Sequence, residues 1–207
     1  MALVKHNNNS ISGITSFDNM PSGAMTLITE VTANSDASIS FVDGSSDVAL
    51  DRTYPLYKFE FINIHPATDN VHFSFQGNAS GGSGFNETIT STAFYAQHRE
   101  DGSATALDYR TGEDQAQGTA FQLLCEGLGN DNDQSLSGYL HLFNPSSTTF
   151  VKHFITQTNQ VRYNDRLYNF HIAGYFNTTS AIDEIQFKMS SGNIDSGTIK
   201  LYGIKDS

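Results

Sequence analysis

Apolar and polar side chains alternate in several short segments of the sequence, and this alternation limits the fold more than any other feature. In residues 56–64, Tyr57, Phe59 and Phe61 are separated by polar side chains, and residues 70–76 repeat the pattern. Successive side chains of a strand point to opposite faces of a sheet, so a period of two predicts strands with one buried face. The chain is therefore expected to fold as a β protein.

Segments with strand character recur along the chain and are separated by turn residues. They lie at residues 26–32, 37–42, 56–64, 70–76, 90–97, 119–126, 137–144, 149–157, 168–176, 184–190 and 197–204. About ten short strands with turn signals between them are typical of a sandwich. No connection is long enough to hold a crossover helix, so antiparallel pairing is expected. The sequence predicts an all-β, antiparallel β-sandwich of jelly-roll type with about 8–10 strands, formed by residues 25–207.

Residues 119–126 also fit a helix. Apolar residues from Phe121 to Leu128 have the i, i+3, i+4, i+7 spacing of a helical face. Glycines at positions 118, 127 and 129 leave room for barely two turns, so a strand is favoured. Cys125, the only cysteine of the chain, has apolar neighbours and is expected to be a buried, unreactive thiol.

A hairpin is predicted around Pro145, because proline has no backbone N–H for a sheet ladder and ends the preceding strand. Leu140 and Leu142 are expected on the buried face of that strand. His141 on the opposite face and His153 on the returning strand are expected to form a cross-strand polar pair.

Residues 1–24 differ in composition from the rest of the chain. They are polar, contain Pro21 and two glycines, and lack a sustained period, so they cannot bury much apolar surface alone. We expect an extended N-terminal arm that is held by a partner. The start of the chain also lacks the apolar stretch of a signal peptide, and no run could cross a bilayer. Synthesis in a cytosol, without membrane insertion, is therefore expected.

Charged residues make up only 16% of the chain, and its formal net charge is −11. Nucleic-acid binding requires clustered Lys and Arg, which no segment provides, so a nucleic-acid partner is not expected. The acidic balance also disfavours contact with anionic membranes. Much of the polarity comes from Ser, Thr, Asn and Gly, which fits subunits of shells and fibres and fits an ordinary β domain equally well.

No catalytic motif is recognisable. Residues 81–85 begin a nucleophile elbow but end in Phe85, and phosphate-loop, dinucleotide and HExxH motifs are missing. Asp131, Asp133 and Ser135 alternate as calcium ligands do, but the glycine and the bidentate Glu of a calcium loop are missing. An Asx-rich turn is the favoured interpretation, and cation binding there stays open. We expect no catalytic residue, cofactor or metal. The alternative is a pair of carboxylates for glycan cleavage among the 22 acidic residues, none of which is marked by a motif.

Several stretches carry a resemblance to a known family. The most specific are NPSSTTFVKHF and SGNIDSGTIKLYGI, and the resemblance covers about residues 37–204. These stretches resemble virion structural proteins of tailed marine bacteriophages, including cyanophages. Proteins of this family are mostly structural or fibre-like, so the resemblance implies no catalytic residue. Residues 1–36 resemble the short variable starts by which such proteins attach to the particle.

The resemblance implies a non-enzymatic virion structural protein, made in the host cytoplasm, that forms a tail-fibre-like appendage contacting the host surface. A capsid decoration protein and a jelly-roll glycan-binding or glycan-degrading domain are the alternatives. The expected partners are other virion proteins, through the arm, and a glycan or protein of the host surface. Phage fibres similar to this family are commonly trimeric, so we expect a homotrimer. Tyr57 or Tyr139 is a candidate for an aromatic side chain on its outer face.

Receptor contact is expected in two loops, residues 77–86 and 156–169, which are long for a sandwich and rich in Asn and Gln. Tyr and Arg are enriched at recognition hot spots. The candidate receptor-contact residues of the second loop are Arg162, Tyr163, Arg166 and Tyr168. The alternative is that both loops are solvated connections or subunit contacts.

Overall fold

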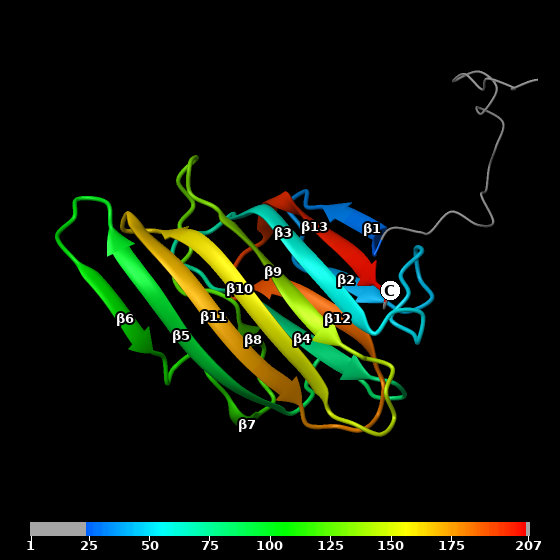
Figure 1. The fold of residues 1–207 in the computed structure, drawn as a ribbon. Helices are drawn as coiled ribbons and strands as arrows, with labels where there is room; N and C mark the ends of the chain where they lie inside the picture. Colours follow the sequence, from blue (N-terminus) through cyan, green and yellow to red (C-terminus); the bar gives the residue numbers. More distant parts are fainter. Residues whose placement is uncertain (1–23, 206–207) are drawn as a thin grey trace, which may run out of the picture.

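The computed structural model describes residues 24–205, which form two antiparallel β-sheets packed face to face (Figure 1). The larger sheet has nine strands in the order β1-β13-β3-β9-β10-β11-β5-β6, with β7 paired to β5. The smaller sheet has four strands in the order β2-β12-β4-β8 and lies behind the larger one in Figure 1.

The larger sheet is made of long strands at its centre and short ones at one edge. Its strands are β1 (Met25–Thr32), β3 (Leu56–Pro66), β5 (Ile89–Arg99), β6 (Thr105–Tyr109), β7 (Ala116–Gly118), β9 (Leu136–Phe143), β10 (Lys152–Arg162), β11 (Arg166–Phe176) and β13 (Ile194–Ile204). Those of the smaller sheet are β2 (Ile39–Val42), β4 (Phe73–Ala79), β8 (Gln122–Leu123) and β12 (Ile182–Met189).

The predicted all-β, antiparallel sandwich is confirmed. None of the described residues lies in a helix, and residues 24–205 therefore contain no helix that could span a membrane. The finer assignment of a jelly-roll winding stays a prediction, because β9, β10 and β11 follow one another as neighbours in a single sheet. The predicted arm lies outside the described residues except for Ala24.

The core between the sheets is built from aromatic rings. Phe187 on β12 is fully buried, and its ring centroid lies 5.3 to 6.3 Å from the rings of Phe41, Phe59, Phe61, Phe73 and Phe75. These rings come from both sheets, so Phe187 ties one layer to the other. The alternation seen in residues 56–64 marks the buried face of β3, as predicted.

The suggestion that Tyr57 lies on the outer face is wrong. Tyr57 has the same alternation as its buried neighbours on β3, and no part of it is exposed. Its hydroxyl donates to the backbone oxygen of Asp51 at 3.1 Å, which satisfies the phenol inside the core. Burial raises the pKa of Tyr57 above its ordinary value. Tyr139 does point away from the smaller sheet and is half-buried.

The predicted hairpin around Pro145 is confirmed. Leu140 and Leu142 are fully buried, and β9 ends at Phe143, two residues before the proline. The returning strand begins at Lys152, later than the sequence indicated. Lys152 is itself buried, and its ammonium group donates to the backbone oxygens of Phe150 and Thr178.

Two parts of the strand prediction are wrong. Residues 119–126 form only the two-residue strand β8, and the rest of that segment is irregular. The strands β6 and β7 were not predicted, because an edge strand with mostly exposed side chains carries no alternation. The expected loop at 77–86 is also shorter than predicted, since Gly77 to Ala79 are buried residues of β4.

Candidate functional site

The face of the larger sheet that points away from the smaller sheet, here called the outer face, lacks charge over three adjacent strands. Strand alternation and register bring twelve side chains together there: His153, Ile155, Gln157 and Asn159 of β10, Asn169, His171, Ala173 and Tyr175 of β11, and Thr90, Thr92, Phe94 and Ala96 of β5. None is Asp, Glu, Lys or Arg, in a chain with 22 acidic and 11 basic residues. This surface is uncharged within an acidic protein.

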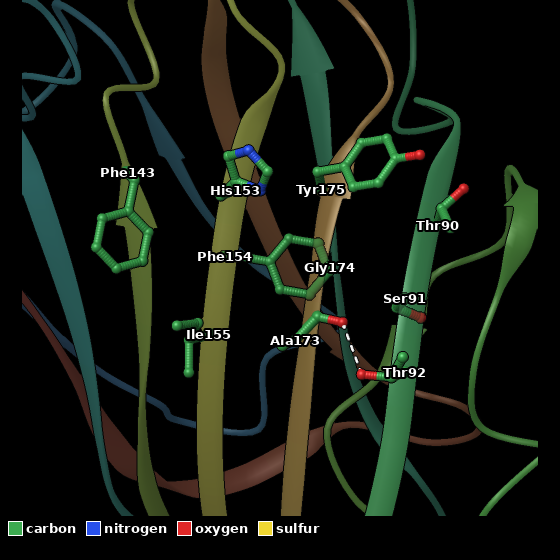
Figure 2. Close-up of a pocket in the computed structure, with 10 residues that line it drawn as sticks. All are labelled: Thr90, Ser91, Thr92, Phe143, His153, Phe154, Ile155, Ala173, Gly174 and Tyr175. Atoms are coloured by element: carbon green, nitrogen blue, oxygen red, sulfur yellow. Dashed lines mark hydrogen bonds between the residues drawn. The ribbon is translucent and has the colours of Figure 1, made fainter.

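A hollow of about 630 Å³ opens on this outer face. Figure 2 shows its outward side chains in two rows that run across the strands. The upper row is Phe143, His153, Tyr175 and Thr90, and the lower row is Ile155, Ala173 and Thr92. His153 and Tyr175 are cross-strand partners, with ring centroids 5.9 Å apart.

A second hollow of about 220 Å³ continues the first along the strands. The two share Thr92, Ile155 and Ala173. The second ends at Phe94 and His171, whose rings are stacked with centroids 5.0 Å apart. We call the two hollows together the outer groove.

Small residues at the centre of β11 keep the groove open. Ala173 has only a methyl group on the outer face, between the longer side chains of Ile155 and Thr92. Its neighbour Gly174 faces inward, where a Cβ atom would lie 2.7 Å from the ring of Phe154. A larger residue at position 174 would therefore push against the core and deform the floor of the groove.

The predicted receptor-contact loop at 156–169 is not a loop. Strands β10 and β11 run through it and are joined by a turn at residues 163–165. Tyr168 is only 3% exposed and stacks inside on Tyr95, with ring centroids 4.6 Å apart. It is therefore unavailable to a receptor, and that assignment is wrong for this residue.

The other three candidates lie near the turn in different settings. Arg162 is half-buried and binds the carboxylate of Glu126 at 2.9 Å, so its positive charge is paired within the protein. Tyr163 is 39% exposed at the turn, and Arg166 donates to Gln97 at 3.3 Å. A contact role stays a prediction for Tyr163 and Arg166.

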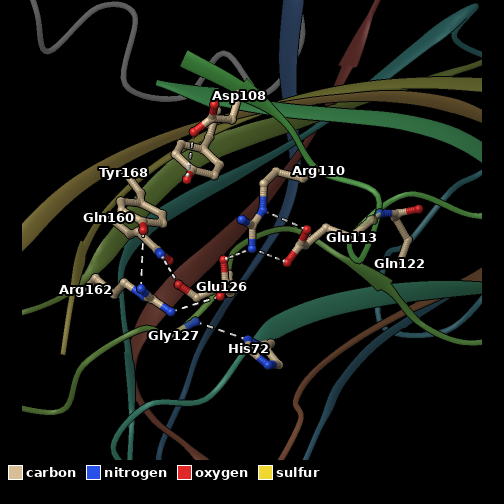
Figure 3. A network of polar contacts seen from close by, with 11 residues as sticks. His72, Asp108, Arg110, Glu113, Gln122, Glu126, Gly127, Gln160, Arg162 and Tyr168 are labelled. Atoms are coloured by element: carbon tan, nitrogen blue, oxygen red, sulfur yellow. Dashed lines mark hydrogen bonds and ion pairs between the residues drawn. The ribbon is translucent and has the colours of Figure 1, made fainter. Parts of the chain in front are cut away.

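A network of ion pairs lies on the inner side of β10 and β11 (Figure 3). Arg110 donates to Glu113 at 2.9 Å and to Glu126 at 2.7 Å, and Arg162 binds the second oxygen of Glu126. These carboxylates raise the pKa of Arg110 above its ordinary value. The guanidinium groups of Arg110 and Arg162 also lie over the rings of Tyr95 and Tyr168, each 5.1 Å from the centroid.

The network fastens the irregular segment between β6 and β9 onto the sheet. Thr158 and Gln160 of β10 add hydrogen bonds to the carbonyl oxygens of Leu124 and Glu126. Glu113 and Glu126 both accept hydrogen bonds from Arg110, so they are one pair of neighbouring carboxylates of the kind considered for glycan cleavage. Both are held by guanidinium groups, so this pair has a structural role.

The His141–His153 pair and the Asp131–Asp133 turn, both singled out in the sequence, do not form a binding site in the structure. The predicted pair of His141 and His153 is wrong, because the register places Ile155 opposite His141. Burial, with a smaller effect of the Lys58 charge, lowers the pKa of His141, which favours its neutral form.

Among residues 24–205, no group of three or more His, Cys, Asp and Glu side chains could hold a metal ion. Asp131 and Asp133 are exposed turn residues.

Cys125 is buried, as predicted. Its sulfur accepts a hydrogen bond from the backbone N–H of Phe73 at 3.1 Å, and burial raises the pKa of the thiol to about 12.

A thiol reagent should therefore label Cys125 in the native protein at least about 10³-fold more slowly than in the denatured protein, since reaction requires unfolding. Stopped-flow labelling with and without denaturant measures this ratio. Equal rates in the two conditions would show that the segment around Cys125 opens in the native state.

The comparisons with known proteins found no relative: no protein-family model, curated protein or solved structure matches the chain. The outer groove was also missed by sequence reasoning. Its signal was present only in the outward half of each alternating strand, where the large apolar residues Phe94 and Ile155 stand among mostly polar residues.

Proposed function

We propose that the chain is a non-enzymatic virion structural protein of a tailed bacteriophage, forming a fibre-like appendage that contacts the host surface. The observation that carries the proposal is the outer groove, an uncharged, partly apolar recess on a broad sheet. Exposed apolar recesses of this kind mark binding surfaces in soluble proteins. The sequence resemblance to marine phage virion proteins supplies the virion context, and we propose that residues 1–24 attach the protein to a neighbouring virion protein.

Particle incorporation tests this proposal. Purified particles should contain the protein by mass spectrometry, and antibody labelling in electron micrographs should place it on the tail. When residues 1–24 are deleted, purified particles should no longer contain the protein. The melting temperature of the truncated protein should stay nearly unchanged, because β1 begins at Met25.

Three outcomes contradict parts of the proposal. Label spread over the capsid would favour the head decoration protein instead. Absence from purified particles would overturn the virion role. Incorporation of the truncated protein at normal levels would move the attachment surface from the arm to the sandwich.

A further inference from the structure

We propose that the outer groove binds an uncharged glycan chain laid across β9, β10, β11 and β5. This inference rests on the proposed function, because it names the chemical class of the host-surface molecule that the appendage contacts. The occupant is argued from the charge, the ring chemistry and the length of the groove.

Charge selects an uncharged ligand. The outward side chains of β10, β11 and β5 in the groove include no Asp, Glu, Lys or Arg. The chain as a whole carries a net charge of −11, so an acidic polymer is repelled at long range and finds no cation in the groove. A basic partner finds no carboxylate there either. Electrostatic complementarity therefore favours a neutral molecule.

The side chains of the groove match the two kinds of surface that a sugar presents. A pyranose ring has C–H faces, which pack on aromatic rings, and hydroxyl groups at its rim, which need hydrogen-bond partners. Aromatic rings lie at both ends of the groove, at Tyr175 and at Phe94, which is 43% exposed.

Two hydroxyl groups lie on the β5 side of the groove. The Thr92 hydroxyl donates to the carbonyl oxygen of Ala173 at 3.4 Å and is left to accept. The Thr90 hydroxyl accepts from the Gln117 amide at 2.6 Å and is left to donate.

Amide groups beside the groove are already held in place. The Gln157 amide donates to the side-chain oxygen of Asn169 at 3.2 Å and accepts from the hydroxyl of Tyr139 at 3.3 Å. Both amides are on the outer face, next to His171 in the register. Side chains fixed by one another lose less conformational freedom on binding, which suits recognition of hydroxyl groups.

The length of the groove suits a short run of sugar units. Neighbouring strands are about 4.8 Å apart, so the row from Phe143 to Thr90 across four strands is about 14 Å long. A single small molecule would fill only part of this row. A chain of linked sugars can contact the rings of Phe143, His153 and Tyr175 along this row.

The test uses the full-length protein and a glycan array that holds neutral and acidic oligosaccharides, followed by calorimetry with the best neutral binder. Tyr175→Ala removes a ring, and Ala173→Glu places a charge in the groove without removing a contact. Each should weaken binding by about ten-fold or more. Tyr202→Ala, which removes a half-buried tyrosine on the outer face of β13, outside the groove, is the matched control and should bind as the native protein does. Melting temperatures of all three variants verify folding.

Binding of no neutral oligosaccharide overturns the inference, as does equal loss in the Tyr202→Ala control. Stronger binding of acidic than neutral glycans also overturns it. Self-association in sedimentation that Ala173→Glu abolishes, without glycan binding, would assign the groove to a second copy of the chain. Particle incorporation separates the two proposals. A protein present in particles that binds no glycan overturns only this inference, and one that binds glycan but is absent from particles overturns only the virion role.

Discussion

Replacing Phe187 with alanine is expected to lower the free energy of unfolding by about 4 kcal/mol. The ring is fully buried and packs against rings from both sheets. Phe59 lies 5.3 Å away in the larger sheet, and Phe73 lies 5.8 Å away in the smaller one. The surrounding strands cannot close the cavity, because each is fixed by its own ladder of hydrogen bonds. Equilibrium unfolding in urea measures the change.

Phe150→Ala is the matched control for this experiment. Phe150 is 68% exposed in the connection between β9 and β10, so its removal should change the free energy of unfolding by no more than about 0.5 kcal/mol. Similar losses from the two variants would mean that the rings around Phe187 do not hold the sheets together. A changed denaturant slope in Phe187→Ala would indicate a less compact native or unfolded state.

Much of the sandwich was predictable because its central strands follow the simplest rule. In β3 and β12 the inward positions are mainly Phe, Tyr, Ile and Met, and β4 begins with Phe73 and Phe75, so the period of two is visible in the sequence. A strand in the middle of a sheet packs one face against the core, and its sequence reflects that burial directly.

The strands on either side of the β10–β11 turn were read as a loop for a physical reason. The inward positions of β10 beyond Ile155 are Thr156, Thr158 and Gln160, which are buried but polar. The Thr158 hydroxyl and the Gln160 amide N–H donate to backbone oxygens of the irregular segment that covers them. That segment is more than thirty residues away in the sequence, and its position is fixed only by tertiary contacts. The local sequence is therefore a run of polar residues, and such a run predicts a connection rather than two strands.

The outer groove could not be predicted from single strands. Its rows are made by register, which places His153 opposite Tyr175 and Tyr175 opposite Thr90. Each of these residues is unremarkable in its own strand. Only the order β9-β10-β11-β5 brings their side chains to one surface, and that order depends on a pairing between strands far apart in the chain.

Replacing Glu126 with glutamine is expected to lower the free energy of unfolding by about 2 kcal/mol. Glu126 receives hydrogen bonds from both Arg110 and Arg162, and its side chain is 18% exposed. Removing one member of a fully buried ion pair costs about 3–5 kcal/mol, and an exposed pair contributes about 1 kcal/mol at most. Partial exposure places this network between those limits. The loss arises because two guanidinium groups stay close together without the carboxylate that neutralised them.

Glu30→Gln is the matched control, because Glu30 pairs with Lys200 at 3.3 Å on the exposed edge strand β1. Its effect should be below about 0.5 kcal/mol and should vanish in about 1 M salt, whereas the loss in Glu126→Gln should persist because salt screens exposed charges most. Urea unfolding at low and high salt measures both variants. Equal effects of the two substitutions would mean that the network does not fasten the irregular segment. In that case the hydrogen bonds from Thr158 and Gln160 would be its principal anchor on β10.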